Sequence, residues 1–176
     1  MATFSFNLID QPWIPCITSA DANAKPLGLR ETLGRSDEIV EIADPSPLVV
    51  AAIHRLLLAI VHRVVNGPAS ARHWYDLWSA EKLEASTLDA YFEKHRYRFD
   101  LFDASHPFYQ TAGLDYAYET SISKLVHELA SGNNATLFDH TLDGSPPSLT
   151  PAQAAGYLVA LQPFAVGGLI TFEKGQ

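Results

Sequence analysis

The densest group of side chains that could bind a ligand lies in the stretch KHRYR, residues 94–98. It contains the cations Lys94, Arg96 and Arg98, together with His95 and Tyr97. Cations neutralise phosphate oxygens and aromatic rings stack on nucleobases, so the stretch is a candidate for phosphate contacts with a nucleic acid. A solvated helix end, with its cations close to the negative end of the helix dipole, is an open alternative.

Two glycines and one aromatic ring are further binding candidates. Gly167 and Gly168 lack Cβ atoms, so their backbone could approach a ligand or a nucleic-acid groove closely, although a helix stop followed by a turn fits the same residues. Phe138 lies in the polar stretch LASGNNATLFDH, residues 129–140, which also contains Asn133 and Asn134. The ring either packs beneath its own loop or is presented for stacking, and the residues alone leave this open.

Signatures of metal binding and of cofactor binding are weak in this chain. His54 and His62 are eight residues apart, which separates them by about 12 Å along a helix, and the i, i+4 spacing of zinc-binding helices is absent. Cys16 lies in the apolar stretch WIPCI, where thiols usually serve as inert packing groups. The sequence has neither a Walker loop nor a G-x-G-x-x-G stretch. We therefore predict no metal and no nucleotide cofactor.

A hydrolase is the catalytic alternative. It would use His106 or His140 with a nearby carboxylate, namely Asp100, Asp103 or Asp139. The motivation is only the local density of His and Asp, because Asp in loops commonly accepts hydrogen bonds from neighbouring backbone amides.

Composition describes an acidic globular domain. The chain has 176 residues, 47% of them hydrophobic, and a formal net charge of −8. This size fits one domain with a sizeable core, and the acidity argues against a basic coat that binds nucleic acid over its whole surface. Any phosphate contact must be local. The single cysteine fits a reducing compartment, and the N-terminal stretch MATFSFNLID lacks the pattern of a signal peptide, so we expect a cytoplasmic protein.

The elements that would position these residues are mostly helices. Apolar alternation predicts strands at 4–10 and 13–18 joined by a turn, another strand at 39–42 and a helical turn at 29–33. Helices are predicted over 47–65, 69–80, 86–98, 120–132 and 150–164. Ser46 and Thr150 are the expected N-caps, and Gly132 is the expected stop of its helix. The prediction is one mixed, mostly helical α+β domain with a short N-terminal antiparallel strand pair.

Two segments of the chain are so apolar that they are expected to be buried against other parts of the protein, a partner or a membrane. Residues 47–65 approach the length of a membrane span, but His54, Arg55, His62 and Arg63 interrupt them, so we predict a buried soluble helix and no membrane partner. The terminal stretch FAVGGLITFEKGQ is also apolar and needs a neighbour. It indicates either a longer native polypeptide or a protein-protein adaptor that uses this edge as its interface.

Five stretches of the chain, in order, resemble one family. They are FNLIDQPWIP, AAIHRLLLAI, RFDLFDASHPFYQ, NNATLFDH and LVALQPFAVGGL, and together they extend across essentially the whole chain. The family is CasA, the large subunit of the type I-E CRISPR surveillance complex Cascade. The large subunit of this family is considerably longer than this chain and has two parts, an N-terminal α/β domain and a C-terminal four-helix bundle. The resemblance therefore implies that residues 1–176 form the N-terminal part of the α/β domain, without the four-helix bundle.

The resemblance implies a non-catalytic role beside other Cascade subunits. The family's subunit recognises the protospacer-adjacent motif in double-stranded DNA, contacts the 5′ handle region of the guide RNA and helps to recruit the helicase-nuclease. Phe138, with Asn133 and Asn134 before it, matches the family's loop aromatic that contacts the handle region. Gly167 and Gly168 match its glycine loop, which approaches the minor groove of the motif. Some relatives carry a zinc-binding C-x-x-C pair after the Phe loop, and here that region reads DGSPPSLTP, so no zinc is predicted.

Overall fold

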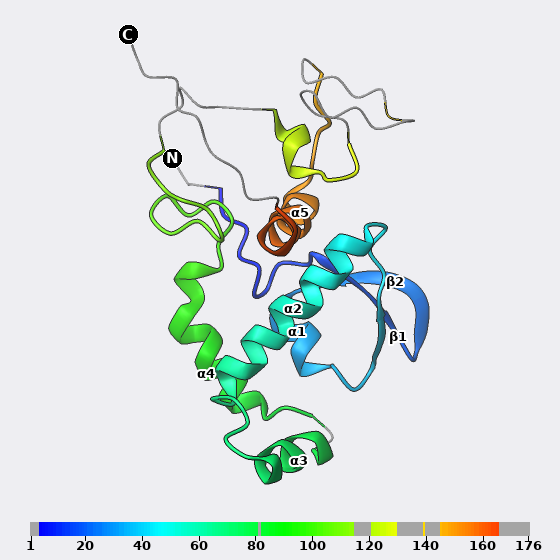
Figure 1. Ribbon diagram of the computed structural model, residues 1–176, viewed down its shortest axis with the longest axis vertical. Helices are drawn as coiled ribbons and strands as arrows, with labels where there is room; N and C mark the ends of the chain where they lie inside the picture. Colours follow the sequence, from blue (N-terminus) through cyan, green and yellow to red (C-terminus); the bar gives the residue numbers. More distant parts are fainter. Residues whose placement is uncertain (1–3, 81, 115–120, 130–138, 140–144, 166–176) are drawn as a thin grey trace.

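The computed structural model describes residues 4–80, 82–114, 121–129, 139 and 145–165. The strands are β1 (Ile14–Thr18), β2 (Asp21–Leu27) and β3 (Ile39–Ile42), and the helices are α1 (Leu29–Gly34), α2 (Pro47–Val64), α3 (Ala71–Ser79), α4 (Ala85–His95) and α5 (Pro151–Phe164). Helix α2 runs through the middle of the molecule, with the sheet on one side of it and α4 on the other (Figure 1). The predicted α+β class, mostly helical, is confirmed.

The sheet is antiparallel, with strand order β2-β1-β3. Strand β1 lies at its centre and pairs Ile14 with Leu27 on one side and Cys16 with Ile42 on the other. All four of these side chains are buried. Their placement follows from the period of two in a strand, which sends alternate residues of β1 to the same face.

The strand predicted at 4–10 is wrong, and the antiparallel pair is β1 with β2 instead. Within this segment, all of which the structure describes, Asn7 makes an isolated bridge with Asp100 and no strand forms. The side-chain Oδ1 of Asn7 accepts a hydrogen bond from the backbone N–H of Ile9 (3.1 Å), and its carbonyl accepts from Asp10 (3.2 Å) and Gln11. These local bonds turn the chain where the apolar alternation predicted an extended one.

Helix α2 begins and ends where its sequence predicts. The hydroxyl of Ser46 accepts the N–H of Val49, Pro47 occupies the first turn, and Asn66 and Gly67 follow the helix with φ of 58° and 62°. The helix is long and apolar enough to cross a membrane by length and composition, a test that the core helix of a soluble protein also passes. One face of it is buried in this structure, formed by Val49, Ala52, Ile53, Leu56 and Ile60.

Helix α5 packs along α2. It begins with a capping box, in which the Thr150 side chain accepts from Gln153 N–H and the Gln153 side chain accepts from Thr150 N–H. Gly156 brings the two helices close together, because a Cβ built at this position would lie 3.2 Å from Cγ1 of Val49. The predicted helix over 150–164 is confirmed.

Helix α4 is joined to the core by the aromatic side chain of Phe92, which is fully buried. A 3-10 turn, Arg96–Arg98, follows it directly. The chain then pairs with the N-terminal segment, where Leu8 N–H donates to the carbonyl of Phe99 (2.8 Å). Phe99 and Phe108 are buried and stack with ring centroids 5.7 Å apart.

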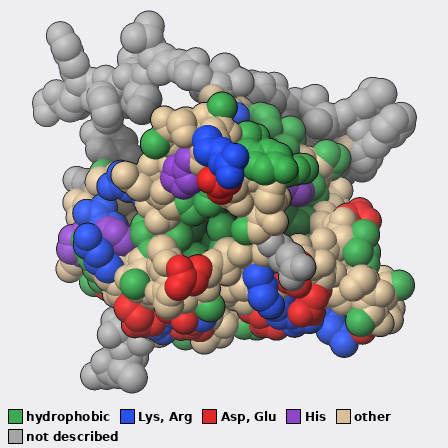
Figure 2. Space-filling view, turned by 90° about the horizontal axis from the view of Figure 1, so that it is seen from below, with side chains coloured by type: hydrophobic (Ala, Val, Ile, Leu, Met, Phe, Trp, Pro, Cys, Tyr) green, Lys and Arg blue, Asp and Glu red, His purple; other side chains and the backbone are tan. Residues whose placement is uncertain are grey.

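Helix α3 projects from the C-terminal end of α2, at the bottom of Figure 1, and has no buried residue. Its rings Trp74 and Trp78 are 53% and 74% exposed and lie 6.0 Å apart between centroids. Figure 2, the view from below, looks onto this end and shows hydrophobic side chains exposed among basic, acidic and His side chains. The predicted helix over 69–80 is confirmed, within two residues at its start.

The helix predicted over 120–132 is wrong within its described part, residues 121–129. Only the 3-10 turn Ile122–Leu125 forms there, and Val126 is extended with φ of −98° and ψ of 104°. The hydroxyl of Ser121 accepts the N–H of Ser123, which satisfies a donor locally and closes a single turn. The predicted stop at Gly132 lies outside the described residues.

Candidate nucleic-acid interface

The three predicted phosphate contacts at the end of α4 have different surroundings. The Arg96 guanidinium pairs with Asp10 (2.6 Å) and more loosely with Glu93 (3.9 Å). Lys94 is exposed, and the described part of the chain gives it no ion pair. Arg98 likewise has no carboxylate partner among the described residues, and its Nε donates to the Tyr97 hydroxyl (2.9 Å). Arg98 and Lys94 therefore have charge available for an anion, whereas Arg96 is already paired.

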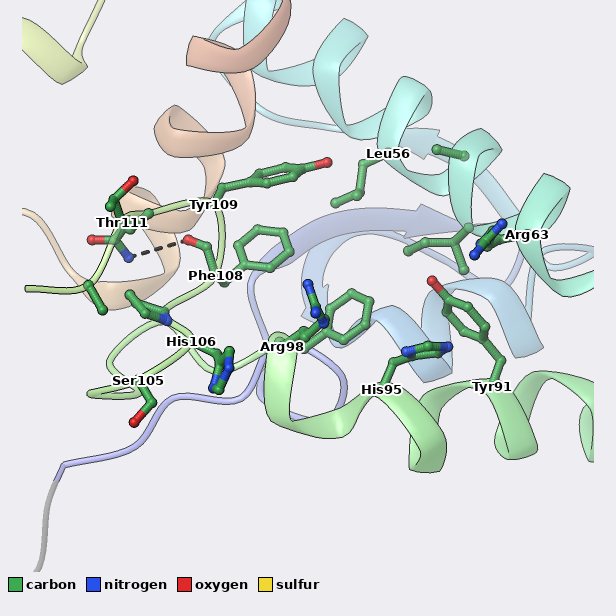
Figure 3. Close-up of a pocket in the computed structure, with 16 residues that line it drawn as sticks. Leu56, Arg63, Tyr91, His95, Arg98, Ser105, His106, Phe108, Tyr109 and Thr111 are labelled. Atoms are coloured by element: carbon green, nitrogen blue, oxygen red, sulfur yellow. Dashed lines mark hydrogen bonds between the residues drawn. The ribbon is translucent and has the colours of Figure 1, made fainter.

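Arg98 lines a hollow of about 710 Å³ between α2, α4 and the segment that follows Arg98. Figure 3 shows side chains of these three parts around the hollow. Its floor is apolar, since Leu56, Ile60, Phe99 and Phe108 line it and are all buried. The rings of Phe99 and Phe108, which form part of this floor, stack on each other.

The edge of this hollow is positive. Arg63 from α2 and Arg98 carry its charge, His95 and His106 also line it, and no Asp or Glu does so among the described residues. The described structure records no carboxylate within ion-pair distance of Arg63 either. In a chain with a net charge of −8, this is a local cationic site that an anion could enter without meeting a carboxylate at its edge.

Two tyrosines supply aromatic surface at the same hollow, of which Tyr109 is exposed and Tyr91 is half-buried. Tyr91 lies on α4, with its ring centroid 4.8 Å from that of His95. Tyr109 comes from the opposite side, 4.4 Å from the Phe108 ring, and reaches toward Leu56 (Figure 3). Burial raises the pKa of both Tyr91 and Tyr109, so both phenols are neutral at physiological pH.

Tyr109 has an unusual backbone conformation, with φ of 54°. This left-handed region is costly for a bulky side chain and recurs at functional sites, where the surrounding structure enforces it. Here the Gln110 side-chain amide donates to the carbonyls of Leu101 (2.9 Å) and Phe108 (3.3 Å) and fixes the turn from the next position. The ring is thereby positioned at the edge of the hollow.

Burial and the positive charges around the hollow both lower the pKa of His95. Partial burial, and then the positive charges of Lys94, Arg63 and Arg98, lower the pKa of this imidazole from 6.5. A cluster of cations that disfavours protonation of a neighbouring His favours an anion for the same reason. The arrangement can therefore hold a negatively charged group beside an aromatic one.

Two of the three carboxylates of the hydrolase alternative, Asp100 and Asp103, have structural roles in the loop after Arg98. Asp100 accepts the N–H of Phe102 (2.8 Å), and Asp103 accepts the N–H groups of His106 (2.6 Å) and Ser105 (2.8 Å). The hydrogen bond from His106, and after it the one from Ser105, lowers the pKa of the Asp103 carboxyl. These bonds restrain the loop that carries His106.

Cys16 and the histidines also show no assembled reactive centre in the described part of the chain. Cys16 is buried in β1, and burial raises the pKa of its thiol, as expected of a packing residue. His54 contacts the carbonyl of Val50 on its own helix (2.8 Å). The described residues bring together no group of three His, Cys, Asp or Glu side chains that could hold a metal ion.

The remaining predicted site residues lie outside the described residues. They are Asn133, Asn134, Phe138, Gly167 and Gly168, together with His140 of the hydrolase alternative. The structure therefore brings together Arg98, one of the predicted contacts, with three residues that the sequence did not single out for binding: Arg63, Tyr91 and Tyr109. Tyr91, His95 and Arg98 are spaced by four and three residues, so one helical face could have been read from the sequence. Nothing in the sequence links them to Arg63 or Tyr109.

The chain is similar in sequence to members of one known family. The family model described as CRISPR-associated protein Cse1 matches residues 7–175. A CRISPR-associated protein CasA/Cse1 of Thermus thermophilus is 44% identical over 165 residues, which cover 94% of this chain and 32% of that protein. The chain thus spans about a third of the length of this relative.

Solved structures agree with the sequence comparison. A crystal structure of CasA from Thermus thermophilus superposes with a TM-score of 0.79 at 36% identity, over 95% of this chain and 32% of that one. A chain of a structure described as a CRISPR RNA-guided surveillance complex, pre-nicking, superposes with a TM-score of 0.77 at 29% identity, over 89% of this chain and 33% of that one.

Proposed function

Because the chain belongs to the CRISPR-associated Cse1 family, we propose that it serves as part of a non-catalytic subunit of the type I-E guide-RNA surveillance complex Cascade in antiviral defence. The observation that carries the proposal is its similarity, in sequence and fold, to a chain of an RNA-guided surveillance complex. The other Cascade subunits and the guide RNA are then its partners, and the cytoplasm is its location.

In this proposal the subunit recognises the protospacer-adjacent motif in double-stranded DNA and helps to recruit the helicase-nuclease. Gly167 and Gly168 approach the minor groove of the motif through their backbone, which suits a groove that is narrow and carries a degenerate code. Phe138, with Asn133 and Asn134, contacts the 5′ handle region of the guide RNA by stacking. These five residues are assigned by their match to the family's motifs.

The described residues support the proposal through their charge distribution. Phosphate contacts by an acidic subunit must be local, and the edge formed by Arg63, His95, Arg98 and His106, which no described carboxylate lines, is such a site. The bonding of Asp100 and Asp103 to loop amides fits a binding role better than a hydrolase, because carboxylates that restrain a loop are not arranged for proton transfer.

Reconstitution tests the proposal with two variants of the complete protein. Guide-loaded Cascade without its large subunit is mixed with wild type, Phe138→Ala or Gly168→Asp, and binding to duplex DNA with and without the motif is measured. We expect Phe138→Ala to weaken incorporation about tenfold, since a stacking contact is lost. We expect Gly168→Asp to assemble normally and lose the preference for the motif, because a carboxylate enters a negatively charged groove.

Two matched changes control for this experiment. Phe102→Ala removes another exposed ring, and Gly34→Asp adds the same charge where an added Cβ would meet nothing within 4 Å. Both controls should behave as wild type. A wild-type protein that restores no DNA binding would refute the Cascade assignment, and normal behaviour of Phe138→Ala or Gly168→Asp would refute the role of that residue alone.

A further inference from the structure

The hollow beside Arg98 has a composition that suits one particular class of ligand. Its apolar floor and the exposed ring of Tyr109 fit a flat aromatic group, and its edge fits an anion close by. A volume of about 710 Å³ lies within the usual range for pockets that bind a small organic molecule. A ligand that presents a flat ring beside a phosphate meets all three conditions, and a nucleotide is such a ligand.

A nucleotide can use this site only when its base is free. In a duplex both faces of a base are covered by its stacked neighbours, so Tyr91 and Tyr109 could not reach them. Protein contacts to unpaired strands, by contrast, combine a positive groove with aromatic rings on which bases stack. We therefore propose that this hollow binds one unpaired nucleotide of a single-stranded nucleic acid, with its base on Tyr109 and its phosphate between Arg63 and Arg98.

The position of Tyr109 also indicates the direction in which the bound nucleic-acid strand continues beyond this nucleotide. The same ring lines a second, smaller hollow of about 220 Å³, which shares Leu56 and Ala59 of α2 with the first. Arg55 lines that second hollow, two helical turns before Arg63 on α2. The Tyr109 ring thus lies between two hollows on the same face of α2, and an arginine lines each hollow. In this arrangement the next phosphate of the nucleic-acid strand lies toward Arg55.

This inference rests on the proposed function for the identity of the nucleic acid. In a surveillance complex both the guide RNA and separated DNA strands could supply the unpaired nucleotide. The base face that the rings contact and the phosphate that the arginines contact are shared by RNA and DNA, so a difference in affinity between them reports a contact to the sugar. Binding of oligouridine more tightly than oligothymidine would assign the pocket to RNA, and the reverse order would assign it to DNA.

The test is a fluorescence anisotropy titration of the complete protein at several salt concentrations. The probes are a short labelled oligouridine, an oligothymidine of the same length and a duplex of the same length. Tyr109→Leu, which removes the ring, should weaken binding to the unpaired strands about tenfold or more, whereas Tyr109→Phe should bind as wild type. Arg98→Gln should lower the slope of log affinity against log salt by about 1.

Arg72→Gln is the matched control for charge. Arg72 is 82% exposed on α3, does not line the hollow and pairs only with Asp76 among the described residues. Equal losses in Arg72→Gln and Arg98→Gln would overturn the proposal in favour of diffuse electrostatic attraction. Unchanged affinity of Tyr109→Leu, equal affinity for the duplex, or no binding of unpaired strands by the wild type would overturn it as well.

The two proposals can fail separately. If wild type restores Cascade while Tyr109→Leu binds unpaired strands normally, only the nucleotide pocket is refuted. If binding depends on Tyr109 and Arg98 while reconstitution fails, only the Cascade assignment is refuted. Thermal unfolding of each variant is recorded in parallel. If Tyr109→Leu folds poorly because position 109 has a positive φ, the result for Arg98→Gln still decides the test.

Discussion

Arg96 and Arg98 are two positions apart in the sequence, yet their guanidinium groups have different surroundings. Arg96 is paired with Asp10 and ties the end of α4 to the N-terminal segment. Among the described residues the Arg98 guanidinium interacts with the hydroxyl and the ring of Tyr97, whose centroid lies 5.3 Å from its Cζ, and with no carboxylate. An arginine without a carboxylate partner keeps its charge for a ligand, so the spacing of charges alone does not identify the functional cation.

The lowered pKa of His95 predicts how the free energy of unfolding depends on pH. Its pKa in the folded protein is lowered from 6.5, so the folded state disfavours the proton that the unfolded chain binds. The free energy of unfolding of wild type should therefore fall as pH decreases through 6.5, relative to His95→Gln. Chemical denaturation of both proteins between about pH 5 and pH 8 measures this difference.

The same imidazole should respond to an anion. A phosphate near Arg63 and Arg98 offsets the charges that lower the pKa of His95, so adding oligouridine should raise that pKa, as followed by NMR titration of the His95 ring. A folded pKa at or above 6.5 before the probe is added would contradict the arrangement of cations described above.

At the scale of the element, Gly28 joins β2 to α1 where no side chain fits. A Cβ at this position would lie 2.5 Å from the carbonyl oxygen of Ile9, a backbone atom that cannot move aside. The next two N–H groups, of Leu29 and Arg30, donate to the carbonyls of Leu8 (3.0 Å) and Ile9 (3.1 Å). The glycine is thus required by close approach of two backbone segments.

Gly28→Ala should lower the free energy of unfolding by about 1–3 kcal/mol, because the added methyl group separates α1 from the N-terminal segment and strains these hydrogen bonds. Gly34→Ala is the control, since an added Cβ there meets nothing within 4 Å and alanine favours the helix. Urea denaturation of the two variants measures both effects. Equal stability of the two would show that Ile9 is not fixed in place.

At the scale of the whole molecule, one ionic cluster connects three distant parts of the chain. Arg30 of α1 pairs with Asp10 (3.1 Å), with Glu93 (2.7 Å) and with Asp89 of α4. Asp10 in turn pairs with Arg96, so the N-terminal segment, α1 and α4 meet at these side chains. The cluster fixes the helix that carries one wall of the hollow.

Asp10→Asn tests the cluster through its dependence on pH. Burial raises the pKa of Asp10, but the hydrogen bonds and charges of Arg96 and Arg30 outweigh burial, so the pKa is lowered from 3.8. The stabilisation is present above pH 3.8 and is lost as pH falls through the lowered pKa. Because the side chain is 40% exposed, we expect a loss of only about 0.5–1 kcal/mol at pH 7.

Thermal unfolding across pH provides the measurement for this cluster. The difference between wild type and Asp10→Asn should shrink to zero in acid, where the wild-type carboxylate is also neutral. Asp37→Asn is the control, because Asp37 is exposed and has no ion pair among the described residues. A difference that persists unchanged in acid would indicate a steric role for Asp10 instead of an ionic one.

The sequence by itself determined the local features of this protein. Ser46 with Pro47, and Thr150 with Pro151 and Gln153, specify where α2 and α5 begin, because capping satisfies backbone donors within a few residues. Ordered motifs along the chain indicated the family. The strand predicted at 4–10 failed because hydrogen bonds of Asn7 override the apolar alternation.

Tertiary structure alone decided which cations and rings form the hollow. Arg63, Tyr91, Arg98 and Tyr109 come from α2, α4, the 3-10 turn and the segment beyond it, and packing of these parts on one apolar floor brings them together. Tertiary structure also paired Arg96 with Asp10, 86 positions earlier, and so distinguished it from Arg98. Local spacing cannot contain this information, since charge availability depends on residues that approach one another only when the chain is folded.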